Sequence, residues 1–458
     1  MCMRSGLVGA LAVGATPGFA QDGGIQTTFG IAQSIEGVRN PALAIPAEDA
    51  DIAATTTLSY SIVSETRTQL FRFGADSSFR IEYDDDDELI GEFEAPTLTF
   101  GYTRAGATSS FSASARFLRE EIDSAPDFSD FVTDDGILEI PDDFTDLSGT
   151  GRRTGYTVAS ILTLGRDRPL GFEFEIGTSG VLYEDVTDPD LTDVTNVSAR
   201  VGTLLRFSDV LSGRLSYGYS LTEEDDTAET VRRTQSIGAG LTYNLSPRST
   251  FDIGIGAEQT ETEVTTGTSE VDGLTGRLGY RQVMPNGDLT AVLDASRDVA
   301  GDLLLEFRLG RSLALPTGTL AVSVGATRPD GDDPAFIGTV DYTYILPDQR
   351  ILLRLDRSVT IDLEDDIRRR TLLGAFYSYD INRFSSLSLG ISHIVAEESD
   401  AAGRVERTDL TGSYSYALTA DWDLSAGFAY SVRDEEAVGE ADSSLISISL
   451  SREFTSRR

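Results

Sequence analysis

The chain has 458 residues, of which 40% are hydrophobic and 24% are charged, so it is neither a disordered acidic tail nor a collagen-like fibre. Its formal net charge is −38, and all 37 basic residues are arginines, because the sequence contains no lysine. Such an acidic chain repels phosphate backbones, which excludes nucleic acid as a partner. A single cysteine, Cys2, and a single histidine, His393, exclude thiolate and multi-histidine metal sites, and no cofactor is expected.

The first twenty residues have the features of a secretory signal peptide. Arg4 precedes a short apolar run, and the segment ends in the residues Gly18-Phe19-Ala20. We therefore expect residues 1–20 to be removed on export and residues 21–458 to form one domain. No later stretch contains the roughly 18 consecutive apolar residues that a membrane-spanning helix needs.

From residue 25 to residue 454, apolar and polar residues alternate in segments of about ten, which is the pattern of β-strands with two different faces. One such segment places Phe172, Phe174 and Ile176 on one face, and Glu173 and Glu175 on the other. The pattern predicts an all-β structure in which each strand has one apolar row and one row that faces water.

The breaks between these segments are of two kinds, which alternate along the chain. Short breaks such as Pro285-Asn286-Gly287-Asp288 have the chemistry of tight turns. Longer breaks, such as residues 84–88 and 184–193, are rich in Asp and Glu. Because successive connections of an antiparallel meander lie at opposite ends of the sheet, one end should carry tight turns and the other acidic loops.

Alternation alone also fits a soluble β-sandwich, but three further features favour a membrane barrel. These are the leader, the asymmetry of the breaks, and aromatic residues beside short turns that suggest an interfacial girdle. The girdle candidates are Tyr243, Tyr280, Tyr344, Tyr379 and Trp422. We predict a transmembrane antiparallel up-and-down β-barrel of about 22 strands, with a range of about 18–24.

On these features the chain resembles single-chain Gram-negative outer-membrane β-barrels, as a class and not as one family. Its last segment, with Ile446, Ile448, Leu450 and Phe454, is similar to the terminal strand by which such proteins reach the barrel-assembly machinery. Arg452 and residues 455–458 depart from that pattern. The resemblance implies a location in the cell outer membrane, with lipid, lipopolysaccharide and the assembly machinery as partners.

If the apolar rows face lipid, the opposite rows face the lumen. Thirteen charged residues of those rows are predicted to line a pore: Arg72, Arg116, Glu173, Glu175, Arg200, Arg214, Asp252, Arg277, Glu306, Arg308, Asp341, Arg354 and Asp356. Opposite charges on neighbouring strands predict cross-strand ion pairs, with Glu173 and Glu175 near Arg200, Asp252 near Arg277, and Asp341 near Arg354.

The sequence therefore predicts a channel rather than an enzyme: a porin-like barrel through which small hydrophilic solutes or ions diffuse passively. Two alternatives remain, a closed structural barrel whose acidic loops bind envelope polymers or divalent cations, and a duct for polysaccharide export. Size creates a conflict, because 22-stranded barrels are wide and usually plugged, whereas the first strand here begins close to the predicted cleavage site. We therefore expect no plug domain and a lumen narrowed in another way.

The candidate for that narrowing is the longest break, an acidic external loop at about residues 120–152. Its apolar residues could anchor it against the barrel wall, so that it folds inward as a constriction. The carboxylates expected in the constriction are Asp127, Asp130, Asp134, Asp135, Glu139, Asp142 and Asp143.

Two further patterns suggest chemistry. The acidic run at residues 84–88 and the segment Asp188-Pro189-Asp190 could bind Ca²⁺ or Mg²⁺ loosely, although neither has the spacing of an EF-hand. Ser392 beside His393 matches the residue types of outer-membrane lipid hydrolases. Adjacent residues of a strand point to opposite faces, however, so this pair has poor geometry for a nucleophile and its base.

Overall fold

The computed structural model describes residues 24–47, 50–83, 89–122, 150–186, 191–297, 303–328, 333–361, 367–398, 404–436 and 438–457. The described residues form β-strands joined by turns and loops, and no helix among them is long and apolar enough to cross a membrane. The predicted signal peptide, residues 1–20, lies outside the described residues, as does the core of the long acidic loop, residues 123–149.

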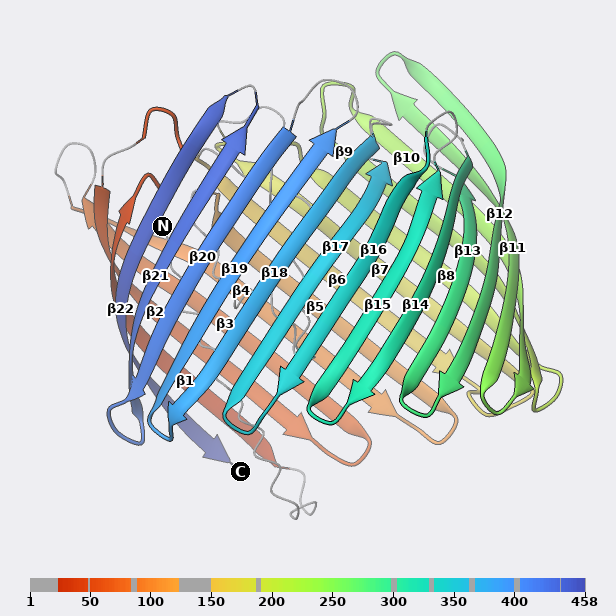
Figure 1. The fold of residues 1–458 in the computed structure, drawn as a ribbon, viewed down its shortest axis with the longest axis horizontal. Helices are drawn as coiled ribbons and strands as arrows, with labels where there is room; N and C mark the ends of the chain where they lie inside the picture. Colours follow the sequence, from red (N-terminus) through yellow and green to blue (C-terminus); the bar gives the residue numbers. More distant parts are fainter. Residues whose placement is uncertain are drawn as a thin grey trace.

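The fold is a single sheet of 22 antiparallel strands, the predicted class and number (Figure 1). The strands are β1 (Ile25–Arg39), β2 (Ala50–Glu65), β3 (Gln69–Tyr83), β4 (Leu89–Ala105), β5 (Ser109–Glu121), β6 (Arg152–Leu164), β7 (Leu170–Glu184), β8 (Val194–Arg206), β9 (Leu211–Glu224), β10 (Thr230–Ser246), β11 (Ser249–Val264), β12 (Gly267–Met284), β13 (Gly287–Arg297), β14 (Leu303–Leu315), β15 (Gly318–Arg328), β16 (Ala335–Ile345), β17 (Gln349–Ile361), β18 (Ile367–Asn382), β19 (Ser385–Glu398), β20 (Arg404–Ala417), β21 (Trp422–Glu435) and β22 (Gly439–Arg457). They are 11 to 19 residues long, longer than the segments of about ten expected from the sequence, so their ends extend beyond a hydrocarbon layer.

Each strand pairs with its neighbours in sequence, and β1 pairs with β22 from Gln26↔Arg457 to Arg39↔Ser444. This seam closes the sheet into a barrel, so that the first and last strands are paired on both sides. The two ends of the barrel differ as predicted. Short turns, such as residues 66–68, 247–248 and 346–348, lie at one end with the carboxyl terminus, and most of the longer connections lie at the other (Figure 1). The two-residue connection 265–266 between β11 and β12 departs from the alternation. We refer to the end with the longer connections as the outer end.

The alternation places apolar side chains outside and small or polar ones inside. On β22, Ile446 and Ile448 are 69% and 57% exposed, whereas Ser447 and Ser449 between and beyond them are buried. Several girdle candidates lie on this outer face near the short turns, where Tyr342 stacks with Tyr344 at 6.4 Å between ring centroids. Exposed apolar rows that encircle a closed sheet fit a barrel surrounded by lipid.

Arg452, which departs from the expected terminal pattern, has a structural explanation. It lies on the lipid-facing row of β22, with its guanidinium carbon 4.4 Å from the ring centroid of Phe454 and 5.4 Å from that of Trp422. A third contact, 3.6 Å long, joins it to Asp421 in the turn between β20 and β21. Two aromatic faces and one carboxylate therefore allow a charge where the pattern expects an apolar residue.

The seam can be tested by disulfide formation. Ser34 and Ser449 are directly opposite and both face inward, so cysteines at these positions should cross-link on oxidation. The matched control pairs S34C with S443C, since Ser443 lies on the same face of β22 but roughly 20 Å further along the strand. Both variants carry C2S, and the cross-link is read from the gel mobility of the folded protein. Equal cross-linking in the two variants would contradict the register.

Candidate functional site

The inner face of the barrel carries charged residues at two levels. All thirteen residues predicted to line a pore lie on this face, opposite the exposed apolar row. Most of them are three to nine positions from the strand ends that carry the short turns, for example Arg214 on β9 and Asp252 on β11. We call this level the inner belt. The structure gives the face on which these residues lie, whereas their role in transport stays a prediction.

The inner belt contains cross-strand ion pairs, with partners that agree in part with the sequence analysis. Arg200 approaches Glu175 at 3.8 Å, and Asp341 approaches Arg354 at 3.8 Å, both as predicted. Glu173 instead pairs with Arg214 at 2.5 Å, and Asp252 accepts a hydrogen bond from Thr242 at 2.6 Å. Arg277, the partner expected for Asp252, contacts Asp294 at 3.1 Å. The sequence identifies the rows of charged residues, but it does not show which neighbouring strand supplies the partner of each arginine.

A recurrent feature explains this reach: arginines of the inner belt stand opposite glycines on a neighbouring strand. The pairs are Arg72↔Gly101, Arg200↔Gly218, Arg214↔Gly240, Arg277↔Gly254, Arg308↔Gly325 and Arg354↔Gly374. Glycine weakens a strand, and it leaves room for another group to approach the backbone. The glycines were visible in the sequence, but their pairing with arginines appears once the register is known.

Gly202 shows what the missing side chain allows. A Cβ at this position would lie 3.5 Å from Nε of Arg214 and 3.6 Å from Cβ of Glu173. Arg214 therefore lies flat over β8 and reaches Glu173 on β7. The side chain follows the wall and does not extend into the lumen.

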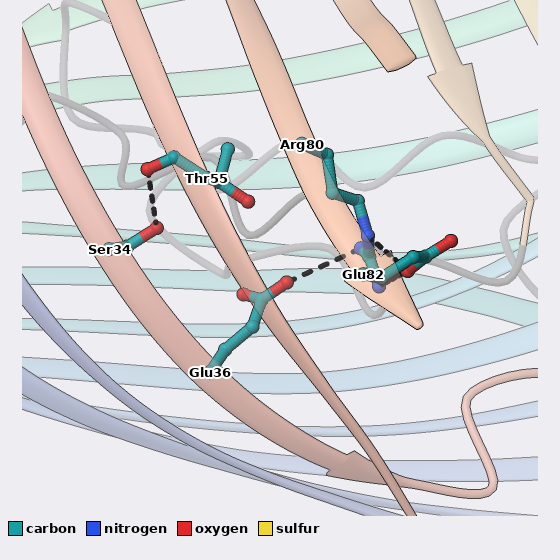
Figure 2. A network of polar contacts seen from close by, with 5 residues as sticks. All are labelled: Ser34, Glu36, Thr55, Arg80 and Glu82. Atoms are coloured by element: carbon teal, nitrogen blue, oxygen red, sulfur yellow. Dashed lines mark hydrogen bonds and ion pairs between the residues drawn. The ribbon is translucent and has the colours of Figure 1, made fainter. Parts of the chain in front are cut away.

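The second level lies nearer the outer end and is buried, and we call it the outer polar layer. Its charged members are at most 9% exposed: Glu36, Arg80, Arg232, Arg370, Arg407 and Asp409. Figure 2 shows one part, in which Arg80 bridges Glu36 on β1 at 3.3 Å and Glu82 on β3 at 2.6 Å. In another part, Asp409 accepts hydrogen bonds from Arg407 at 3.2 Å, Ser431 at 2.8 Å and Ser392 at 3.3 Å.

The inner face is not wet all the way round, which differs from the sequence analysis. On β16 to β19 it also carries buried apolar side chains: Ile337, Leu352, Leu372 and Ile394. Alternation missed them because Leu352 and Leu353 are adjacent leucines of which one faces in and one faces out. The lumen wall is thus shielded from water at these four positions, whereas Arg200 and Arg277 on other strands are more than half exposed.

The structure describes the Ser392 and His393 pair, whereas the other candidate sites lie outside the described residues. Ser392 and His393 point to opposite faces, with His393 Nδ1 2.9 Å from Thr408 Oγ1, so they do not form a nucleophile and base. The seven constriction carboxylates lie outside the described residues, and so do residues 84–88 and the segment Asp188-Pro189-Asp190. Among the residues that the structure does describe, no cluster of acidic, histidine or cysteine side chains is suited to hold a metal ion.

No known protein-family model matches the chain, and no curated protein matches it in sequence. Solved structures do share its fold. The ferric-catecholate import receptor Fiu from E. coli K12 matches 95% of this chain and 82% of its own, with a TM-score of 0.59 and 10% identity. The FrpB iron transporter from Neisseria meningitidis matches over the same shares, with a TM-score of 0.55 and 7% identity. The ferric enterobactin receptor PfeA from Pseudomonas aeruginosa matches 93% of this chain and 81% of its own, with a TM-score of 0.52 and 11% identity.

The fold and location agree with the sequence analysis: this is an outer-membrane β-barrel. The predicted function, a porin-like channel for passive diffusion, is wrong. The three solved structures named above are receptors and an iron transporter, not passive porins, and neither the closed structural barrel nor the polysaccharide duct matches them. The physical reason is size, since 16 to 18 strands leave an aqueous channel, whereas 22-stranded barrels belong to transporters with a filled lumen.

The buried pair in Figure 2 makes a stability prediction. Side chains of Glu36 and Arg80 are 0% and 3% exposed, so R80M should cost about 3–5 kcal/mol by removing the arginine from a buried ion pair. The double variant E36L/R80M should recover most of that loss. The control is R233M, whose solvent-exposed pair with Glu263 should contribute little to stability. Reversible urea unfolding in lipid vesicles measures all three, and equal losses for R80M and R233M would contradict the prediction.

A connection at the outer end predicts a pH dependence. Partial burial raises the pKa of Asp226, but hydrogen bonds from the Thr230 hydroxyl and from the amides of Thr230, Ala228 and Glu229 outweigh it, so the pKa lies below the usual aspartate value. Because the pKa of Asp226 is lower in the folded state, its ionisation stabilises the turn at any pH above the pKa of the unfolded state. This stabilisation is lost as the pH falls through the pKa of the folded state.

Amide hydrogen exchange of residues 225–230, corrected for intrinsic rates, should therefore show protection at pH 7 that decreases on acidification below about pH 4. D226N should lower the protection at pH 7 and remove most of its pH dependence. The same dependence in D226N and in the parent protein would show that another group is responsible.

Proposed function

We propose that this protein is a receptor-type transporter that takes up an iron chelate across the outer membrane. The observation that carries the proposal is the fold, a closed 22-strand barrel that matches receptors for ferric catecholates and an iron transporter over more than nine-tenths of the chain. The charged inner face agrees with it, because polar side chains at two levels can contact a hydrophilic cargo that the membrane excludes.

Burial on the inner face also favours a receptor. The charged side chains of the outer polar layer, on β1, β3, β10, β18 and β20, are shielded from solvent, and β16 to β19 add buried apolar side chains. A passive channel benefits from a uniformly hydrated wall, whereas a transporter that binds its cargo benefits from a shaped and partly dry one. Transport by this route is coupled to energy rather than driven by diffusion.

The other partners expected from the sequence stay part of the proposal. Lipid and lipopolysaccharide would surround the apolar outer row, and the barrel-assembly machinery would insert the chain. Divalent cations would bind at the acidic loops of the outer end. No enzymatic step is required of any of these contacts.

Uptake of radiolabelled iron tests the proposal. The full chain is expressed in a Gram-negative host from which the ferric-catecholate receptors have been deleted, and iron is supplied as its triscatecholate complex. We expect saturable uptake that a protonophore abolishes, because cargo that binds before it moves saturates its receptor. Uptake that rises linearly with the concentration of the iron complex and is unchanged by the protonophore would contradict the proposal. Uptake no greater than that of the vector control would also contradict it.

A further inference from the structure

Two arginines and two glutamates converge on the open wall formed by β7, β8 and β9. Nη1 of Arg200 lies 3.8 Å from one carboxylate oxygen of Glu175, and Nη2 of Arg214 lies 4.0 Å from the other. Arg214 also contacts Glu173 at 2.5 Å. Both guanidinium groups are therefore held within reach of one carboxylate, and their charges are balanced by the two glutamates.

The two signs of charge are not presented equally to the lumen. Side-chain exposure is 55% for Arg200 against 34% for Glu175, and 43% for Arg214 against 21% for Glu173. The same order holds for Arg277 against Asp294, at 59% and 34%, although Arg354 and Asp341 reverse it. In a chain of net charge −38, this part of the lumen wall thus exposes its guanidinium groups more than its carboxylates.

Glycines create this presentation. Gly202 and Gly218 leave β8 and β9 without side chains beneath the arginines, and a Cβ at Gly218 would lie 3.9 Å from Nε of Arg200. Each guanidinium can contact a carboxylate along one edge while its other N–H groups face the lumen, because arginine has five donors in a fixed plane. Lysine, which the chain lacks, has a compact ammonium group without the planar edges that fix the direction of each donor.

We infer that Arg200 and Arg214 form an anion-binding site on the wall of the lumen, which takes an oxygen-rich polyanion such as an anionic metal chelate. The inference rests on the proposed function for the identity of the cargo but not for the existence of the site. The ligand accepts hydrogen bonds from the exposed edges of both guanidiniums, while Glu173 and Glu175 hold those groups in place. The site favours polyanions over neutral complexes, and its affinity falls as salt rises.

Fluorescence anisotropy with pyrenetetrasulfonate, a tetra-anion unrelated to iron, tests the site on the detergent-solubilised full chain. The parent protein should bind the dye, and R200Q/R214Q should bind it about 100-fold more weakly through loss of two charged donors. The matched control R233Q/R404Q removes the same charge from ion pairs on the outer face and should leave binding unchanged. A third variant, G202V, should weaken binding while it keeps both arginines. Heat-dependent gel mobility verifies that every variant is folded.

The outcomes separate the site from the proposed function. Dye binding that depends on Arg200 and Arg214 supports the site even if iron uptake fails. Equal binding by the parent and R200Q/R214Q, or no binding by the parent, overturns it. Import of a neutral ferric hydroxamate but not of the triscatecholate anion would overturn an anionic chelate as the cargo, whereas the dye measurement alone decides whether the site exists.

Discussion

The structure depends on one constraint: a hydrocarbon layer offers no hydrogen-bond partner to a backbone amide, so every strand must be paired on both sides. Pairing of β1 with β22 satisfies it, because the sheet then has no edge within the barrel. Closure also gives each strand one face toward lipid and one toward the lumen. The exposed rows of Leu, Ile, Val and Phe, the aromatic residues near the short turns, and the charged inner rows all follow from that division.

The sequence predicts much of this division because period-two alternation is strong in most strands. The strand number and the two different ends are confirmed, and Arg200 and Asp252 lie on the face opposite the apolar row, while their part in a pore stays a prediction. Alternation fails where both rows are apolar, so it could not show that Leu352 faces inward and Leu353 outward. The reach of Arg214 over Gly202 depends on the register of three strands, which no single segment specifies. The prediction of a passive channel is wrong because a barrel of 22 strands is wider than the barrels that form aqueous channels and has the size of outer-membrane transporters.

Two levels of charge inside the barrel have different physical characters. The outer polar layer is shielded from solvent, so removing one partner of an ion pair in this layer would greatly lower the stability of the fold. The inner belt is wet on β7 to β9, so its pairs contribute little to stability and remain available to a ligand. Exclusive use of arginine suits both levels, because the guanidinium keeps its charge when buried and shares its donors when exposed. A barrel organised in this way has a buried polar layer near its outer end and an accessible charged wall beneath it.

The alternation of faces is tested most directly by spin labels placed one at a time at residues 352–355 of β17, in the C2S protein in lipid vesicles. Collision rates with oxygen, which concentrates in lipid, are compared with those of a water-soluble nickel complex. Labels at Leu353 and Leu355 should favour oxygen, whereas labels at Leu352 and Arg354 should be shielded from it. Oxygen accessibility without a period of two would contradict a closed barrel with its apolar rows in lipid.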